Sequence, residues 1–293
     1  MAQMHNLRRR LASINSTGKI SQGMKLISTT KLKTAQDRVF AARPFARLIA
    51  QLMGDLALQC QKVHPFFQQQ EGRRALFLFT ADRGLCGNFN HQLVALAQDY
   101  LGRAEAEVDL VAVGTEGARA LARAGLPIHT TLLDYTSHPS FNRARQLASL
   151  VEGAYLGGQW QRVDLVYAKF YTVLHQKPRI FQLLPIPDSV GEPEQLVGDW
   201  LFEPDPETVL AHLAQRYLES ELYRALLETQ VGEHGARVQA MDTASGNARE
   251  LAAKLTREYN RQRQGAITTE LAEITAGAAR GDQEFGGKDG GER

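Results

Sequence analysis

The positions of proline constrain the fold of this chain more than any other feature of its sequence. All ten prolines lie between Pro44 and Pro206. Proline removes a backbone donor and clashes with the preceding turn, so long helices are favoured only where it is absent. The first 43 residues and the last 87 residues are therefore free to form long helices, and the middle must hold the turns and short strands.

Both terminal segments carry apolar or small residues at alternating spacings of four and three, the repeat of a coiled coil. The first segment has this seam at Ala35, Val39, Ala42, Ala46, Ile49, Met53 and Leu56, and extends it after a skip through Leu7, Leu11, Ile14, Met24 and Ile27. The last segment has it at Val238, Met241, Ser245, Ala248, Ala252, Leu255 and Tyr259, preceded by a stripe of larger residues at Leu213, Tyr217, Leu222 and Leu226. The later residues are smaller, which predicts a close approach of two helices there. Pro44 should kink the first helix or weaken one of its turns.

The length of the last segment predicts how the two helices are arranged. A helix from Pro206 to Gly277 would measure on the order of 110 Å at about 1.5 Å per residue. This exceeds the width of a compact domain of this size. The simplest packing is an antiparallel coiled coil of the N- and C-terminal helices, with the middle domain inserted at one end and the far end of the pair projecting.

The middle of the chain has the pattern of an α/β domain. Short runs rich in β-branched or aromatic residues predict strands at Arg74–Thr80, Glu107–Gly114, Arg162–Tyr171 and Pro178–Leu184. Helical spacing is found at Asn90–Tyr100, Glu116–Ala124 and Asn142–Leu156, and Val190–Pro206 has the composition of a loop. Strands that alternate with helices indicate a mostly parallel sheet.

Composition excludes several classes of protein. Apolar runs such as Ala75–Phe79 are far shorter than the roughly 20 residues that cross a bilayer, and the basic N-terminus lacks the apolar core of a signal peptide. Cys60 and Cys86 lack the spacing of a zinc site or a disulfide framework, so both are expected to be reduced thiols. We therefore expect a soluble cytoplasmic chain without a metal.

No nucleotide-binding motif is present in the sequence. The pair Gly18–Lys19 is followed by Ile20, and Ser13 stands where a P-loop requires its first glycine. Gly114 and Gly117 are too few for the glycine-rich turn that binds a dinucleotide. No cofactor is predicted.

The segment Asp82–Asn88 follows a strand and allows two interpretations. It could place Cys86 as a nucleophile, but a functional thiol needs a histidine base within reach, and no histidine is suggestively spaced. The favoured interpretation is a tight turn in which Gly84 and Gly87 adopt unusual backbone angles and Asn88 caps the next helix.

Charge is unevenly distributed along the chain. Between residues 1 and 60, ten basic residues face two acidic ones, a net charge of +8. Such a segment could bind nucleic acid through phosphate contacts, lie within an acidic protein collar, or present a solvated basic face. Its few aromatic residues disfavour base stacking, but composition does not choose among these alternatives.

Several blocks together resemble the gamma subunit of F-type ATP synthases. They are Arg8–Ile20 with Met24 and Lys31–Arg38, Ala42–Phe45, Asp82–Gly87, Gln182–Pro187 with Phe202–Pro206, and Glu233–Met241 with Tyr259–Asn260 and Arg263–Ile274. They are collinear with the family and span roughly residues 5 to 280.

The resemblance implies a non-catalytic rotor shaft that couples ion flow through a membrane rotor to ATP synthesis or hydrolysis. The implied fold is a coiled coil with an inserted Rossmann-like α/β domain. Its expected divisions are residues 1–60, 61–205 and 206–280, followed by a polar tail at 281–293 that should be disordered. The implied partners are the alpha and beta subunits of the catalytic ring, an epsilon-type regulatory subunit and the c-ring, at the cytoplasmic face of a bacterial inner membrane, with neither nucleic acid nor a membrane span.

By family position, two pairs of residues would lie where the shaft meets the catalytic ring, Met24 with Arg237 and Gln264 with Thr268. Further candidates for its acidic loops are Arg9, Lys19 and Lys25, and ordinary seam packing is an equally weighted alternative for Met24. The sequence departs from the family pattern at Gly18, Ser28–Thr30, Asn88, Gly246 and the polar tail. These departures leave open whether the rotor belongs to a housekeeping synthase or to an alternative, ion-pumping F-type ATPase.

Overall fold

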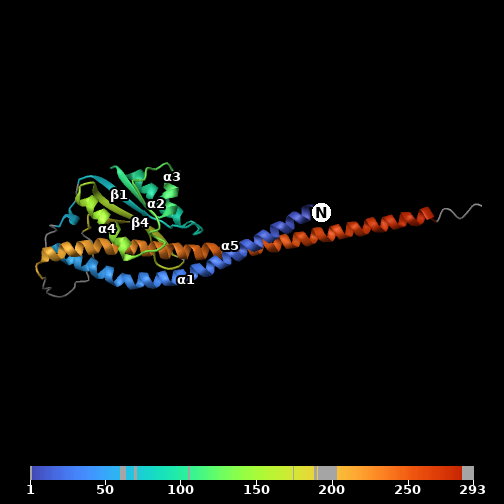
Figure 1. Cartoon of the computed structure of the whole chain (residues 1–293), viewed down its shortest axis with the longest axis horizontal. Helices are drawn as coiled ribbons and strands as arrows, with labels where there is room; N and C mark the ends of the chain where they lie inside the picture. Colours follow the sequence, from blue (N-terminus) through green and yellow to red (C-terminus); the bar gives the residue numbers. More distant parts are fainter. Residues whose placement is uncertain are drawn as a thin grey trace, which may run out of the picture. The chain divides into compact units, whose positions relative to one another are not determined.

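The chain consists of two long terminal helices with an α/β segment between them. The computed structural model describes residues 2–59, 64–68, 71–104, 106–173, 175–187, 190 and 203–285. Helix α1 spans Ala2–Gln59 and helix α5 spans Pro206–Phe285 (Figure 1). Two compact units can be distinguished: residues 25–240 form the α/β unit, and residues 1–24 with 241–293 form the terminal unit. Cys60, most of the predicted loop at Val190–Pro206 and residues 286–293 of the tail lie outside the described residues.

A five-stranded sheet forms the centre of the α/β unit. Its strands are β1 (Arg73–Phe79), β2 (Val108–Val113), β3 (Thr130–Leu132), β4 (Trp160–Phe170) and β5 (Gln176–Leu184), in the order β3-β2-β1-β4-β5. All neighbours are parallel except β5, which runs antiparallel to β4. The prediction of a mostly parallel sheet is confirmed. Strand β3 was not predicted, because three residues are too few to show a periodic pattern.

Helices cover both faces of the sheet. Helices α2 (Phe89–Arg103) and α3 (Thr115–Arg123) pack on one face, where Leu76 and Leu78 of β1 point. Helix α4 (Phe141–Leu156) packs on the other face together with parts of α1 and α5 (Figure 1). A short 3-10 helix, η1 (Pro65–Phe67), precedes β1. Burial on both faces explains why β1 is a continuous apolar run.

In the α/β unit, α1 and α5 pack against each other in opposite directions. The part of α1 near Val39 shares a buried cluster with Leu227 and Val231, whereas its later part near Met53 shares one with residues as early as Leu210. Helix α1 is continuous through Pro44, which is exposed, so no break occurs there. All seven predicted seam positions from Ala35 to Leu56 are fully or partly buried. The predicted seam of this region is confirmed.

The earlier part of the predicted seam was wrong at one position. Ile27 is 61% exposed, and the small polar residues Ser21 and Ser28 are buried instead. With Gly18 and Lys25, which are partly buried, these residues continue the four-and-three spacing from Leu7 to Leu56 without a skip. The apparent skip arose because the sequence prediction counted only apolar side chains, whereas a closely packed seam selects for small ones.

The terminal unit contains the thin part of the helical pair. A Cβ atom on Gly18 would lie 3.2 Å from the Cβ of Ala248, and Leu7, Met241 and Ser245 are buried. Small residues therefore do allow a close approach of the two helices, as predicted. Helix α5 continues to Phe285, beyond the predicted end near Gly277. Among the described residues, no helix contains an apolar stretch long enough to cross a membrane.

Candidate functional site

The carboxylate of Asp82 joins three loops at the carboxyl edge of the sheet. It follows β1 and accepts hydrogen bonds from the backbone amides of Thr115 (3.1 Å), Asp134 (3.0 Å), Thr136 (3.1 Å) and Ser137 (2.8 Å). The hydroxyls of Thr115 and Thr136 donate two more. Ligands of α/β sheets commonly bind at this edge. In this chain, both carboxylate oxygens of Asp82 already accept hydrogen bonds from other residues of the same chain.

The protonation of Asp82 follows from these bonds. Burial opposes the charged form, but the hydrogen bonds from Thr136, Ser137, Thr115 and Asp134 outweigh it and lower the pKa of the carboxyl below its ordinary value. The residue therefore stays ionised at neutral pH and acts as a fixed acceptor.

Arg237 of α5 binds the loop that follows Asp82. Its Nη2 donates to the carbonyl oxygens of Arg83 (3.1 Å) and Gly84 (3.1 Å), and to Oε1 of Glu233 (2.6 Å). The side chains of Arg237 and Glu233 are only 7% and 3% exposed. A second attachment is made by Gln230, whose amide donates to the carbonyl oxygen of Ser137. Helix α5 is thus bonded to two of the three loops that Asp82 joins.

The surroundings of Arg237 shift two further pKa values. Burial raises the pKa of Glu233 above its ordinary value, and the positive charge of Arg237 opposes this shift. Burial, aided by the charge of Arg237, lowers the pKa of His234 to about 4. His234 is therefore neutral at physiological pH, and its Nδ1 lies 3.3 Å from Nη1 of Arg237.

The geometry around Cys86 does not favour a nucleophile. The residue is buried, and burial with the nearby charge of Glu233 raises the pKa of its thiol to about 11. A catalytic thiol requires the opposite shift. The tight turn is present, although its details differ from the prediction: positive φ angles occur at Leu85 and Gly87, not Gly84, and Asn88 makes no side-chain cap.

The two glycines after β2 serve packing against β1. A Cβ atom on Gly114 would clash with the carbonyl oxygen of Thr80, and one on Gly117 would lie 2.5 Å from the Thr80 hydroxyl. The backbone amide of Gly117 donates to that hydroxyl. The turn that would contact a pyrophosphate in a dinucleotide-binding protein is therefore filled by Thr80. No group of metal-ligating side chains is found among the described residues.

The residues proposed from family position lie in different surroundings. In the terminal unit, Arg9, Lys19, Gln264 and Thr268 are exposed, and Met24 is half-buried. The hydroxyl of Thr268 donates to the carbonyl oxygen of Gln264, so the pair shares one turn of α5.

In the α/β unit, Lys25 is half-buried, and Arg237 is buried with its hydrogen bonds directed to its own chain. The sequence reasoning missed Asp82 and Gln230 as elements of this network. An aspartate three residues after the end of a buried strand was the available signal for Asp82, whereas Gln230 showed none because its partner lies in a distant loop.

Comparison with known proteins identifies the family. A protein-family model described as ATP synthase matches residues 3–280. The ATP synthase gamma chain of Moorella thermoacetica is 40% identical, and the match covers 95% of this chain and 99% of the relative. The gamma chain of Heliobacterium modesticaldum is 38% identical over the same shares of the two chains.

Solved structures agree with the sequence relatives. A chain from the cryo-EM structure of the Tetrahymena thermophila mitochondrial ATP synthase central stalk and c-ring matches with a TM-score of 0.62 and 25% identity, covering 77% of this chain and 99% of that one. A chain from the Euglena gracilis mitochondrial ATP synthase matches with a TM-score of 0.69 over 100% of this chain and 98% of its own, at 18% identity, and shows the shared fold. The extent of these matches, together with the α/β unit and the small-residue seam, shows that the chain belongs to the ATP synthase gamma chain family.

Proposed function

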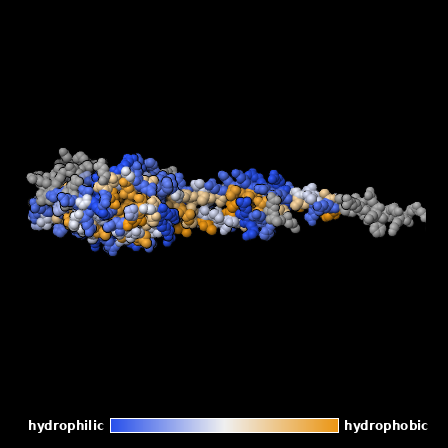
Figure 2. Space-filling view, turned by 90° about the horizontal axis from the view of Figure 1, so that it is seen from above, coloured by the Kyte–Doolittle hydropathy of each residue, from blue (hydrophilic) through white to orange (hydrophobic). Residues whose placement is uncertain are grey.

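We propose that this chain is the central-stalk rotor of an F-type ATP synthase, a non-catalytic subunit that couples ion flow through a membrane rotor to ATP synthesis or hydrolysis. The observation that carries the proposal is an exposed apolar stripe near the end of α5. Ile267, Leu271 and Ile274 are 45%, 60% and 62% exposed and recur at spacings of four and three. Figure 2 shows apolar surface on this part of the helix. An apolar stripe left open to water on a long helix indicates a partner that covers it.

The shaft would act through differential contact. A helical pair with unlike faces presents a different surface to each member of a threefold catalytic ring, so each orientation favours a different conformation at each nucleotide site. Inverting a two-state population from about 1:99 to 99:1 requires roughly 5.5 kcal/mol of differential binding. Several apolar contacts of the size offered by Ile267, Leu271 and Ile274 supply energies of this order.

The contact residues of the shaft are proposed from family position, and the exposure of Arg9, Lys19, Gln264 and Thr268 supports four of them. We assign Gln264 and Thr268 to the contact of α5 with the catalytic ring, and Arg9, Lys19 and Lys25 to acidic loops of its alpha and beta subunits. Met24 would contribute at the edge of the seam. Arg237 would act indirectly, by holding the loop after β1 in the position that faces the ring.

The remaining partners would bind the α/β unit. We propose that it rests on the c-ring and holds an epsilon-type subunit, which places the chain as a peripheral protein at the cytoplasmic face of a bacterial inner membrane. The bacterial relatives support this location. We further propose that residues 1–60 and 206–280 work as the shaft and that residues 61–205 work as its base.

Reconstitution with the catalytic subunits tests the proposal. A variant with Ile267, Leu271 and Ile274 replaced by serine should lose most coupling between ATP hydrolysis and rotation, because the stripe can no longer make apolar contacts with the catalytic subunits. A matched variant with Thr269→Ser, Glu270→Gln and Glu273→Gln changes exposed polar residues of the same turns and should retain coupling. Circular dichroism of both variants verifies that the helix remains.

Two results would contradict the rotor function. One is full coupling after deletion of residues 251–293, which removes the whole exposed end of α5. The other is salt-dependent binding of DNA by the isolated chain together with no affinity for the catalytic subunits, which would assign the +8 segment to phosphate contacts.

A further inference from the structure

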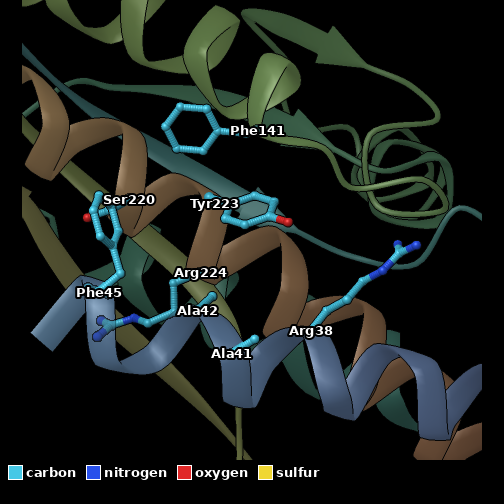
Figure 3. A pocket seen from close by; sticks show the side chains of 9 residues that line it. Arg38, Ala41, Ala42, Phe45, Phe141, Ser220, Tyr223 and Arg224 are labelled. Atoms are coloured by element: carbon cyan, nitrogen blue, oxygen red, sulfur yellow. The ribbon is translucent and has the colours of Figure 1, made fainter.

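A pocket of about 390 Å³ lies between α1, α5 and the start of α4 (Figure 3). All of its lining residues belong to the α/β unit. They are Arg38, Ala41, Ala42, Phe45, Ala46, Phe141, Ser220, Tyr223 and Arg224. Its volume is within the range of roughly 300–1,000 Å³ in which small organic ligands bind.

Aromatic side chains form the walls of the pocket, and small side chains form its floor. Phe141 and Tyr223 meet edge to face with ring centroids 5.8 Å apart, and Phe45, 54% exposed, stands at the rim. Ala41 and Ala42 of α1 leave room between these rings (Figure 3). A flat apolar body can therefore pack among aromatic faces and edges.

One side of the pocket offers hydrogen-bond donors. The Arg38 guanidinium and the Tyr223 hydroxyl both extend toward the side away from Phe45 (Figure 3). Within the part of the chain that the structure describes, neither group has a hydrogen-bonding or ion-pair partner. By contrast, Ser220 donates to the carbonyl oxygen of Tyr217, and Arg224 pairs with Glu221.

The charge of the lining selects the ligand. The lining includes no carboxylate, and of its two arginines Arg224 is already paired with Glu221, which leaves Arg38 to attract an anion. A guanidinium and a phenolic hydroxyl that extend toward the same side of the pocket favour an anionic oxygen group, because both donate hydrogen bonds and charge-assisted hydrogen bonds are the stronger kind. We propose that this pocket binds an aromatic monoanion, with its ring system between Phe141, Tyr223 and Phe45 and its carboxylate or sulfonate at Arg38 and the Tyr223 hydroxyl.

Two fluorescent probes of similar shape test the proposal on the purified full-length chain. Anilinonaphthalene sulfonate is an aromatic monoanion, and phenylnaphthylamine has the same rings without the charge. The pocket should bind the anion more tightly. Arg38→Gln should weaken binding of the anion about fivefold to tenfold and leave binding of the neutral probe within a factor of about two, consistent with the loss of one charge-assisted contact.

A matched control and a filling variant locate the site. Arg47 is an exposed arginine on the same helix outside the lining, so Arg47→Gln should leave the affinity of both probes unchanged. Ala41 is exposed, so Ala41→Trp can fill the pocket without disturbing the core and should abolish saturable binding of both probes. Equal melting temperatures of the variants exclude an effect through folding.

The proposal is overturned by any of three results. They are no saturable binding of the anionic probe, equal effects of Arg38→Gln and Arg47→Gln on its affinity, or unchanged binding of the probes to the Ala41→Trp variant. The last result would assign the probes to another apolar surface, such as the stripe at the end of α5. The measurement needs no partner subunit, so its outcome is independent of the rotor function.

Discussion

Replacing Arg237 by methionine should destabilise the α/β unit far more than the loss of an ordinary surface charge. The change removes the 2.6 Å contact to Glu233 and the bonds to the carbonyl oxygens of Arg83 and Gly84. It leaves Glu233 with a buried carboxylate whose other oxygen, Oε2, already has no hydrogen-bond partner among the described residues. Breaking a buried ion pair from one side costs about 3–5 kcal/mol, and we expect a loss in this range.

Urea unfolding of the full-length chain measures this loss. Arg216→Met is the matched control, because Arg216 lies on the same helix and its partner Glu219 keeps a second ion pair with Arg145. The control should cost less than about 1 kcal/mol, because the Arg216 side chain is 54% exposed and the buried carboxylate of Glu219 keeps its ion pair with Arg145. Hydrogen exchange of residues 83–88 should become faster in the Arg237→Met variant alone.

The stability of the Arg237→Met variant should also depend on pH in a defined direction. Burial raises the pKa of Glu233, and the charge of Arg237 limits that rise. Without Arg237 the pKa rises further, so the folded variant binds its proton more tightly than the unfolded chain does. Its stability therefore falls as pH rises through this pKa, and the defect should be larger near pH 8 than near pH 5. Adding Glu233→Gln should recover part of the loss, since no charge remains buried. A loss below about 1 kcal/mol, or a defect independent of pH, would refute this reasoning.

Three other perturbations have defined outcomes. Gly18→Leu should destabilise the terminal unit by about 1–3 kcal/mol in urea unfolding, because even the Cβ atom of the new side chain would lie 3.2 Å from the Cβ of Ala248. A Cβ atom on Gly23 meets nothing within 4 Å, so Gly23→Ala should instead stabilise the helix by about 0.5–1 kcal/mol. Similar effects of the two substitutions would argue against close packing at Gly18. Because the pKa of His234 is lowered to about 4, the stability that neutral His234 contributes is present above its ordinary pKa of 6.5 and is lost as pH falls toward 4. His234→Gln should therefore make the free energy of unfolding less dependent on pH between these values. An unchanged pH dependence there would contradict the assignment. Cys86, with its pKa raised to about 11, should resist alkylation in the native chain at neutral pH, and rapid labelling measured by mass spectrometry would show that its burial is incomplete.

Local pattern was sufficient for most of the fold. The absence of proline from both ends allowed two long helices, and spacing at Ala35 to Leu56 identified the buried face of α1. The long strands β1, β2, β4 and β5 were also predicted, because burial and alternation leave a signal over six or more residues. The same reasoning failed for β3 and for the seam at Ser21 and Ser28, where the strand was too short or the buried residues were polar.

The candidate site was less accessible from sequence. The motif at Asp82–Gly87 identified a turn and carried the family resemblance, but its bonds come from Thr115, Ser137 and Arg237, which are distant in the chain. Hydrogen bonds between distant segments depend on directions and distances that no local periodicity encodes.

The sequence by itself therefore determined that the chain ends in two helices, that an α/β domain lies between them, and which faces of the elements are apolar, because proline content and periodicity act over neighbouring residues. Only the tertiary structure decided that Arg237 turns inward to hold a loop, that Gly18 serves a close helix contact, and that Arg38 and Tyr223 share a pocket. Each of these depends on which segments meet in space, and that is fixed by the packing of the whole unit.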